Sequence, residues 1–481
     1  MGAGARAAAV EPLNSDRGSG LLIGVLALLS FWVVEQLHLP ASFGIKGLNA
    51  INLLMLLTLS VAVVVRGTSD SSGPAPLKWP ILLFFVALIW GFSIGQLIDN
   101  SETAADLTIL KTGVFYISLY FLFYYAVRTV REIRFLVLVL MGVAVLAGLE
   151  AMIEAVDYGL SAYSESKRAA GPFGPNYRAS NLAAVYFAIF IPLFVAVAFF
   201  LSDRPVVRVA AVLGAGLLIA ALFFTYSRQA YAIVAIVALL LALRKNLFVA
   251  LLLSLALWNY DLWVPGSAVE RVQMTTEQSD ESGRQALDES TASRFELWEG
   301  ASRMLADRPL GIGLNRFKRE VGNYTRYTNL DAHNFYVLIT AEAGLIGGVA
   351  ILILAIAMLR LATSQLMLAR TAEAKTMAYG FLGATLALLM GNLYGSRFLT
   401  GEVIGNYWVL AALSARYFQL LRDNRLDDTA PAPAALDPAR PLRSADGRRL
   451  AAAEPHAQPG TAPVPMSRDQ FGRLSRAREI S

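Results

Sequence analysis

Apolar segments long enough to cross a lipid bilayer recur along almost the whole chain. A bilayer-spanning helix needs about 20 mostly apolar residues, and 56% of the 481 residues are hydrophobic while 16% are charged. This composition excludes a soluble globular protein. The pattern predicts an all-α polytopic membrane protein with about twelve transmembrane helices. Their approximate bounds are 21–39, 48–65, 80–98, 110–127, 133–156, 180–201, 206–225, 229–243, 246–260, 334–359, 375–394 and 402–421.

Charges in the predicted loops give an independent test of this count. Lysine and arginine gather in alternate loops, whereas the loop at 99–106 carries three acidic residues. Because cytoplasmic loops are enriched in Lys and Arg, we expect both termini in the cytoplasm. The eighth and ninth segments are short for full crossings, and suit either a tight helical hairpin or a tilted pair. The residues on the cytoplasmic side are Arg66, Lys78, Arg128, Arg131, Arg134, Arg204, Arg208, Arg244, Lys245, Arg360, Arg370 and Lys375.

Five regions follow from the pattern. They are a cytoplasmic N-terminal segment (1–20), transmembrane helices one to nine (21–260), a long extracytoplasmic loop between helices nine and ten (261–333), helices ten to twelve (334–421), and a disordered cytoplasmic tail (422–481).

The long loop contains the stretch SRFELWEGASRMLADRP, which predicts an amphipathic helix. Ser293 and Glu296 have capping-box spacing at its start, and Gly311 and Gly313 predict a turn after its end. Such a helix would lie on the membrane or cover a cavity between the spans.

Several kinds of chemistry have no support in the sequence. Cysteine is absent, and we find no Walker phosphate loop, no HExxH motif and no DxD acidic pair in the outer loops. We therefore expect no cofactor, no metal site and no nucleic-acid partner. A metal-independent reaction is favoured, with arginines stabilising a leaving phosphate.

His333 is the leading catalytic candidate. It is the only histidine in the predicted structured extracytoplasmic part, and it directly precedes the tenth span. The positive end of the helix dipole there disfavours an imidazolium, so His333 is suited to accept a proton. The alternative is a polar residue that caps the helix at the interface. His38 is assigned to the interface and His456 to the tail.

The arginine candidates are residues on the extracytoplasmic side, against the positive-inside tendency: Arg178, Arg228, Arg294 and Arg397. As a group they suit a diphosphate, because guanidinium binds phosphate oxygens in bidentate fashion. Arg228, in the tight turn TYSRQ, is the strongest individual candidate. The alternative for each arginine is an ion pair with a carboxylate such as Glu342 or Glu402.

Two further residues belong to the tenth span and its edge. Glu342 lies inside an apolar helix, where an ionised carboxylate needs a partner, so a salt bridge to an arginine is favoured over acid–base catalysis. Asn334 either bonds a ligand or caps the helix. We assign Glu342 and Arg397 structural or secondary roles, and Asn334 to the substrate-binding group.

Four pieces of sequence, in this order, resemble the superfamily of O-antigen ligases and Wzy-type O-antigen and exopolysaccharide polymerases. They are GPFGPNYRASNLAA, TYSRQA, SRFELWEGASRMLADRPLGIGLNRF and HNFYVLITAEAGLIGG, which together span roughly residues 171–350. Two departures, the Tyr177-Arg178 insertion and the unmatched stretch 267–290, leave the acceptor open.

The resemblance implies a glycosyltransferase of the bacterial inner membrane, active on the periplasmic face. It would move a glycan from undecaprenyl diphosphate to a glycan or lipid A core acceptor. By family analogy, His333 would align or deprotonate the acceptor hydroxyl. Arg228 and Arg294, with Arg178, would hold the lipid diphosphate. Other envelope polysaccharide assembly proteins are possible partners.

Other functions stay open at this point. A polymerase, a ligase and a protein O-oligosaccharyltransferase differ only in their acceptor, for which the loop carries no motif. A secondary transporter or flippase would show symmetric halves and polar residues at mid-membrane, whereas here the polar candidates gather at the outer surface. A non-catalytic scaffold would leave His333 and Arg228 replaceable.

Overall fold

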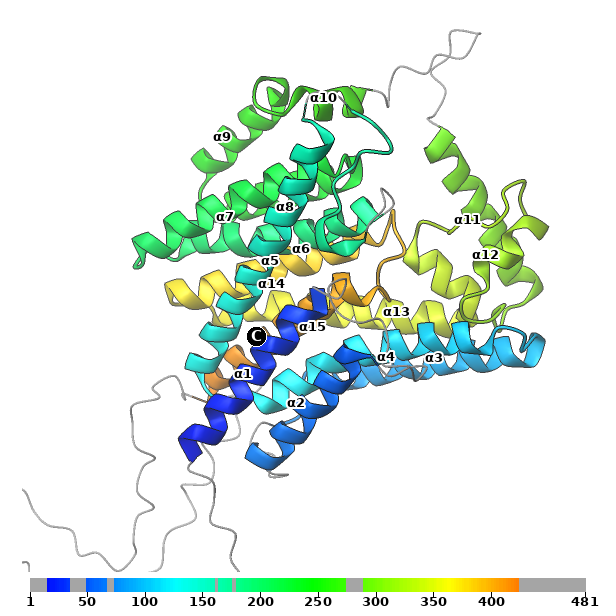
Figure 1. The fold of residues 1–481 in the computed structure, drawn as a ribbon, viewed down its shortest axis with the longest axis horizontal. Coiled ribbons are helices and arrows are strands. Elements are labelled where there is room, and N and C mark those ends of the chain that lie inside the picture. Colours follow the sequence, from blue (N-terminus) through cyan, green and yellow to red (C-terminus); the bar gives the residue numbers. More distant parts are fainter. Residues whose placement is uncertain are drawn as a thin grey trace, which may run out of the picture. The chain divides into compact units, whose positions relative to one another are not determined.

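The computed structural model describes residues 15–34, 49–66, 73–160, 163–174, 179–273 and 289–423. Within these ranges all regular structure is helical, which confirms the predicted all-α class (Figure 1). Arg178, His38, His456, the first fourteen residues and the tail beyond Asp423 lie outside the described residues. The α-helices are α1 (Ser15–Val34), α2 (Ala50–Arg66), α3 (Lys78–Ile98), α4 (Thr103–Ala126), α5 (Val130–Tyr158), α6 (Ser180–Phe200), α7 (Pro205–Phe224), α8 (Arg228–Lys245), α9 (Leu247–Trp258), α10 (Gly266–Gln273), α11 (Glu289–Asp307), α12 (Phe317–Glu320), α13 (Phe335–Leu368), α14 (Ala372–Gly391) and α15 (Gly401–Arg422), with short 3-10 turns at Gly171–Phe173, Tyr260–Leu262 and Val321–Asn323.

Each predicted span overlaps one of these helices, and the protein is a polytopic membrane protein. Among the described residues, six helices (α3, α4, α5, α6, α7 and α13) are long and apolar enough to cross a bilayer. Helices α1, α2 and α9 are apolar but shorter. With 12 residues, α9 rises only about 18 Å, against a hydrocarbon core of about 30 Å. The twelve-span count and the orientation of the termini stay predictions.

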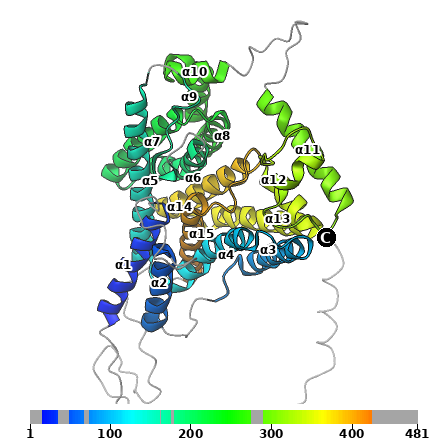
Figure 2. The ribbon, with the colours of Figure 1, turned by 45° about the vertical axis from the view of Figure 1, so that its right-hand side comes forward.

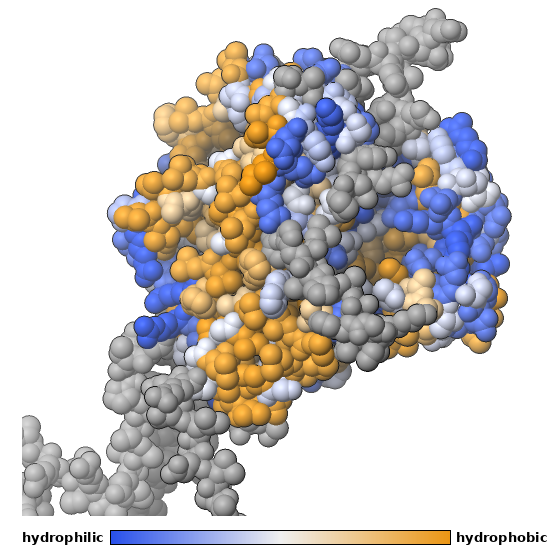
Figure 3. All heavy atoms as spheres, viewed as in Figure 1, coloured by the Kyte–Doolittle hydropathy of each residue, from blue (hydrophilic) through white to orange (hydrophobic). Residues whose placement is uncertain are grey.

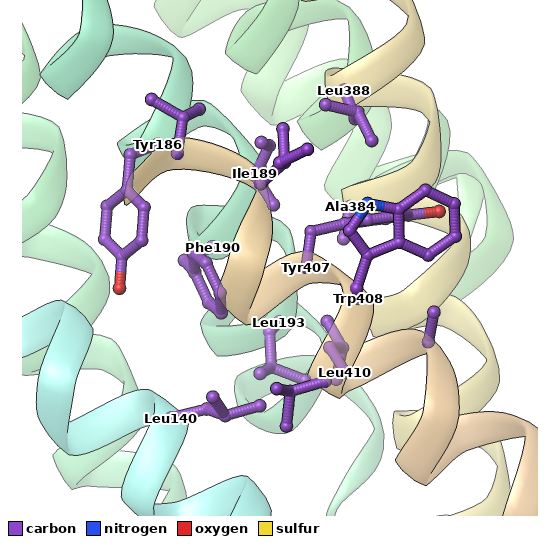
Figure 4. Packing of buried hydrophobic residues seen from close by; sticks show 14 of the residues in the cluster. Leu140, Tyr186, Ile189, Phe190, Leu193, Ala384, Leu388, Tyr407, Trp408 and Leu410 are labelled. Atoms are coloured by element: carbon purple, nitrogen blue, oxygen red, sulfur yellow. The ribbon is translucent and has the colours of Figure 1, made fainter. Parts of the chain in front are cut away.

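Helix α6 lies at the centre of the bundle and packs against α7, α8, α14 and α15. It lies beside α14 in two views (Figures 1 and 2). Small residues allow this close approach, because a side chain at Gly383 of α14 would meet Pro192 of α6. Around the contact, rings and aliphatic side chains of α6, α14 and α15 interdigitate (Figure 4). The labelled residues from these helices include Tyr186, Phe190, Leu388, Tyr407 and Trp408.

Helix α13 is broken at Gly344, where φ is +68° and ψ is −165°. The chain segment before α12 inserts at this break. The N–H groups of Ile312 and Gly313 donate to the carbonyls of Ala341 (3.0 Å) and Glu342 (2.9 Å). In return, the N–H of Leu345, which would bond to residue 341 in a regular helix, donates to the Pro309 carbonyl (3.2 Å).

Gly311 and Gly313 therefore do more than form the predicted turn. Both have φ above +100°, and a Cβ at Gly311 would lie 2.4 Å from the Glu342 carbonyl. A Cβ at Gly313 would lie 2.5 Å from Gly95 of α3. The glycines let the segment pass between α3 and α13 at backbone contact distance.

Arginines after this segment fix it to α3 and α4. Asp106 of α4 is buried and accepts from Asn315 (3.1 Å), and it pairs with Arg316 (3.6 Å) and Arg319 (3.4 Å). Arg316 is itself buried and also contacts Asp99. A buried charge is costly unless its partner is correctly placed, so these ion pairs fix the position of α12.

Helix α11 confirms the predicted amphipathic helix but begins four residues before Ser293, at Glu289. The predicted capping box is therefore wrong, and Glu296 instead pairs with Arg326 (2.9 Å). The apolar side of α11 forms a separate small core with α12 and the first part of α13; its buried residues are Leu297, Ala301, Met304, Ile312, Phe317, Val321, Ala332 and Ala341. Hydrophilic residues cover the outer side of α11 and α12, while hydrophobic residues cover α2 and α7 (Figure 3).

The break in α13 yields a stability prediction. Gly344→Ala should lower the free energy of unfolding by about 2–5 kcal/mol, because its backbone is left-handed and a Cβ would lie 2.5 Å from the Leu310 backbone. Unfolding in SDS, followed by tryptophan fluorescence, measures the change. Gly142→Ala is the matched control, since a Cβ on this helical glycine of α5 meets nothing within 4 Å. Equal effects of the two substitutions would contradict the structural role of the break.

Candidate functional site

A cavity of about 230 Å³ brings together residues that are far apart in the sequence. Among the residues that the structure describes, five arginines and His333 line it, with Glu165 as the one carboxylate. Three of the predicted arginines, Arg228, Arg294 and Arg397, therefore lie around one cavity with His333. We call it the arginine cavity. Its lining is Glu165, Arg168, Asn181, Val185, Tyr226, Ser227, Arg228, Gln229, Arg271, Arg294, His333, Tyr394, Gly395 and Arg397.

The turn TYSRQ brings Arg228 to the cavity. Helix α7 ends at Phe224 and α8 begins at Arg228, so the turn is as tight as predicted. Tyr226 has a left-handed backbone (φ +51°), and its hydroxyl donates to Ser267 at the start of α10 (3.0 Å). The amide of Gln229 donates to the carbonyl of Gly391 at the end of α14 (2.8 Å). The turn is thus fixed to two other elements, which holds the first residue of α8 at the cavity.

His333 sits on a constrained backbone at the same cavity. Its φ is +51°, a left-handed value that non-glycine residues adopt seldom. The Asp331 carboxylate holds this conformation by accepting from the His333 N–H (3.1 Å) and from the Ser396 hydroxyl (2.7 Å). The next residue but one, Phe335, donates its N–H to the carbonyls of Asn392 (2.9 Å) and Gly395 (3.1 Å). Such constraint is common where a side chain must keep one position.

The surroundings favour the neutral form of the His333 imidazole. Burial lowers its pKa below the usual value, and the positive charges of Arg294, Arg397 and Lys318 lower it further, while the Asp331 carboxylate acts in the opposite direction. A neutral imidazole can accept a proton, which agrees with the role expected from its place before a helix.

Arg294 and Arg397 approach the cavity from different elements. The Arg294 guanidinium of α11 lies over the Tyr394 ring, 5.4 Å from its centre. Trp298, one turn further along α11, donates its indole N–H to the Ala332 carbonyl (2.9 Å), beside His333. Arg397 is held by its backbone N–H, which donates to the Asn392 side chain (2.9 Å), and burial lowers the pKa of its guanidinium. Sequence reasoning gave Arg397 a secondary role, but it lines the cavity.

Sequence reasoning missed Arg168, Arg271 and Glu165. Arg168 is buried and donates to the Thr225 carbonyl (2.9 Å) and to Asn181 (2.8 Å), and it pairs with Glu165 (3.1 Å). Arg271 of α10 pairs with the other oxygen of Glu165 (3.6 Å). Burial raises the pKa of Glu165, but the Tyr163 hydroxyl and the two guanidinium groups outweigh it and lower the pKa overall. The positive-inside rule contained the signal, since both arginines lie in predicted extracytoplasmic loops.

Asn334 and Glu342 lie elsewhere. The Asn334 side chain caps α13 by accepting from the N–H groups of Tyr336 (2.9 Å) and Val337 (3.1 Å), and it is not part of the cavity lining. The expected salt bridge of Glu342 is wrong. Its buried carboxylate instead accepts from the backbone N–H of Phe317 (3.1 Å) at the start of α12, and forms no ion pair within the described ranges.

The expected absence of a metal site stays a prediction. Among the residues that the structure describes, no group of three or more His, Cys, Asp or Glu side chains is placed to hold a metal ion. The charged groups of the cavity are mostly cationic, so its chemistry suits an anionic ligand.

Comparison with known proteins agrees with the resemblance seen in the sequence. Residues 213–352 match the Wzy_C family, described as O-antigen ligase. This part of the chain is therefore a Wzy_C O-antigen ligase domain, and it contains Arg228, Arg271, Arg294 and His333. The piece GPFGPNYRASNLAA precedes the matched region. A search of curated proteins gave no match.

The environment of His333 predicts its titration. The chain has three histidines, so NMR of histidine-labelled protein can assign His333 through His333→Gln. We expect a pKa below about 6.5, a lower value in Asp331→Asn, and a higher one in Arg294→Gln. A folded-state pKa below the unfolded value means that the unfolded chain binds the proton more tightly, so this group costs stability as pH falls below about 6.5. A pKa above 6.5, or the opposite order of variants, would contradict this account.

Proposed function

We propose that this protein, through the Wzy_C domain at residues 213–352, moves a glycan from undecaprenyl diphosphate to an acceptor hydroxyl. The reaction would occur on the periplasmic face of the bacterial inner membrane. One observation carries the proposal: among the described residues, His333 and five arginines line a single cavity at the ends of membrane helices. A base beside a cluster of cations is what glycosyl transfer from a diphosphate requires.

In the proposed reaction, His333 accepts the proton of the acceptor hydroxyl. The hydroxyl oxygen bonds to the anomeric carbon of the donor glycan, and the bond from that carbon to the diphosphate oxygen breaks. The imidazolium then releases its proton to solvent. The lowered pKa of His333 supports this role, because the imidazole stays neutral and ready to accept a proton.

The arginines would stabilise the leaving diphosphate. Its negative charge rises as the glycosidic bond breaks, because a bridging oxygen becomes a terminal one. Arg228 and Arg294 are the proposed principal phosphate contacts, and Arg397 adds a third charge near His333. Cations that are already fixed in place stabilise the charged state more than the starting state, which lowers the barrier. Because arginines can stabilise the leaving diphosphate, the proposed reaction needs no metal ion.

Arg168 and Arg271 contribute differently. Both pair with Glu165, which offsets part of their charge and fixes their orientation. We assign them a positioning role, since Arg168 links the loop before α6 to the TYSRQ turn through the Thr225 carbonyl.

Transfer from an undecaprenyl-diphosphate oligosaccharide by the purified full-length protein tests the proposal. His333→Ala should reduce kcat by about 100-fold or more, because the base is lost. Arg228→Ala and Arg294→Ala should each lower kcat/KM by about 100-fold, and Arg228→Lys should restore little, because lysine cannot bind phosphate in bidentate fashion. Activity should persist in EDTA.

Arg308→Ala is the matched control, since Arg308 lies in the same loop but is exposed and outside the cavity. The product separates the acceptor classes: a ladder indicates a polymerase, a single addition a ligase, and a glycosylated polypeptide a protein O-oligosaccharyltransferase. Normal transfer by the folded His333→Ala and Arg228→Ala proteins would refute the catalytic assignment.

A further inference from the structure

A second hollow, of about 530 Å³, lies on the extramembrane part formed by α11 and α12. It is open to solvent rather than enclosed. Its lining residues, Phe295, Glu296, Glu299, Arg303, Asn323, Tyr324, Thr325 and Arg326, are separate from those of the arginine cavity. We call it the outer hollow.

The charges of the described residues at the outer hollow balance, unlike those at the arginine cavity. Two glutamates face two arginines, and they are paired: Arg303 with Glu299 (2.6 Å) and Arg326 with Glu296 (2.9 Å). Arg303 also donates to the Tyr324 carbonyl (3.1 Å). A site whose arginines already pair with carboxylates has little preference for an anion, so phosphate or an acidic chain is disfavoured.

The remaining lining fits an uncharged sugar. Pyranose rings stack their apolar C–H faces on aromatic rings and bond their hydroxyls to planar polar side chains. Phe295 offers a ring that is 52% exposed, although α11 has a buried side available for apolar residues. Asn323, Thr325 and the paired carboxylates and guanidiniums supply donors and acceptors at the same hollow.

Aromatic rings connect this hollow to the arginine cavity. Phe295 packs edge-on against Trp298 (ring centres 5.4 Å apart), and Trp298 packs against Tyr394 (5.9 Å). Tyr394 lines the arginine cavity and is 41% exposed. Arg294 and Phe295 are neighbours on α11, yet Arg294 lines the arginine cavity and Phe295 lines the outer hollow.

We infer that the outer hollow is a glycan-binding subsite, in which Phe295 and the surrounding polar side chains hold uncharged sugar residues of the chain that is transferred. The inference rests on the proposed function, because it is the glycan emerging from the arginine cavity that would pass along Tyr394 and Trp298. Donor phosphate and glycan are then bound on two faces of one helix.

The test is binding of lipid-free oligosaccharides to full-length protein in detergent, which needs no catalysis. An array of neutral and acidic bacterial oligosaccharides selects the probe, and calorimetric titration of the best neutral binder gives its Kd. Phe295→Ala should raise this Kd by roughly fivefold or more, and Phe295→Trp should keep it near the wild-type value. Phe248→Ala, which removes a 68% exposed ring from α9, should have no effect.

Each outcome decides the inference. The inference is overturned if no neutral oligosaccharide binds, or if acidic oligosaccharides bind more strongly. It is also overturned if the Phe295→Ala protein keeps the wild-type Kd and the wild-type melting temperature. The same titration with His333→Ala should give the wild-type Kd. If neutral glycans bind through Phe295 but the wild-type protein transfers nothing, the subsite stands and the proposed function fails. If transfer proceeds but binding does not depend on Phe295, the proposed function stands and the subsite is refuted.

Discussion

The exchange of hydrogen bonds at Gly344 is the interaction on which the positions of α11 and α12 depend. A break in a membrane helix leaves backbone groups without partners, and in a low-dielectric environment each such group costs several kcal/mol. Here the segment around Gly311 and Gly313 supplies those partners and receives one in return from Leu345. The backbone groups of the loop and of the broken helix therefore have hydrogen-bond partners only when the two are packed together. Glu342 strengthens the joint, since its carboxylate holds the start of α12 without a cationic partner among the described residues.

This joint has consequences for the arginine cavity. It sets the first part of α13 and, with the Asp106 network, the position of α12, and both form the small core on which α11 packs. Helix α11 carries Arg294, and α13 begins two residues after His333. His333, proposed to act on the acceptor hydroxyl, and Arg294, proposed to bind the leaving diphosphate, are thus held by the same packed unit. Their separation does not depend on a long unsupported loop.

Electrostatics then distinguishes two binding environments on this unit. The arginine cavity concentrates positive charge, which suits an anion. Burial lowers the pKa of His333, and the positive charges lower it further. The outer hollow pairs its charges internally and presents an exposed ring. The proposed division of labour follows from this difference: a lipid-linked diphosphate in the first environment, and uncharged sugars in the second. Aromatic contacts through Trp298 join the two.

Sequence alone determined the class of fold, the approximate helices and the amphipathic helix before α12, because apolar length and charge asymmetry are local properties of a chain. Charge asymmetry and motif order also singled out His333, Arg228 and Arg294 as candidates, and the structure places all three at one cavity. It did not reveal Arg168, Arg271 and Glu165, whose roles arise from contacts between loops that are distant in sequence. Nor did it give the partner of Glu342. An apolar helix indicates that a buried carboxylate needs a partner, but nearly every residue has a backbone N–H, so the sequence does not identify which one donates. Only tertiary structure decided that the glycines after α11 meet a broken helix, because the hydrogen bonds that satisfy that break come from residues about 30 positions away.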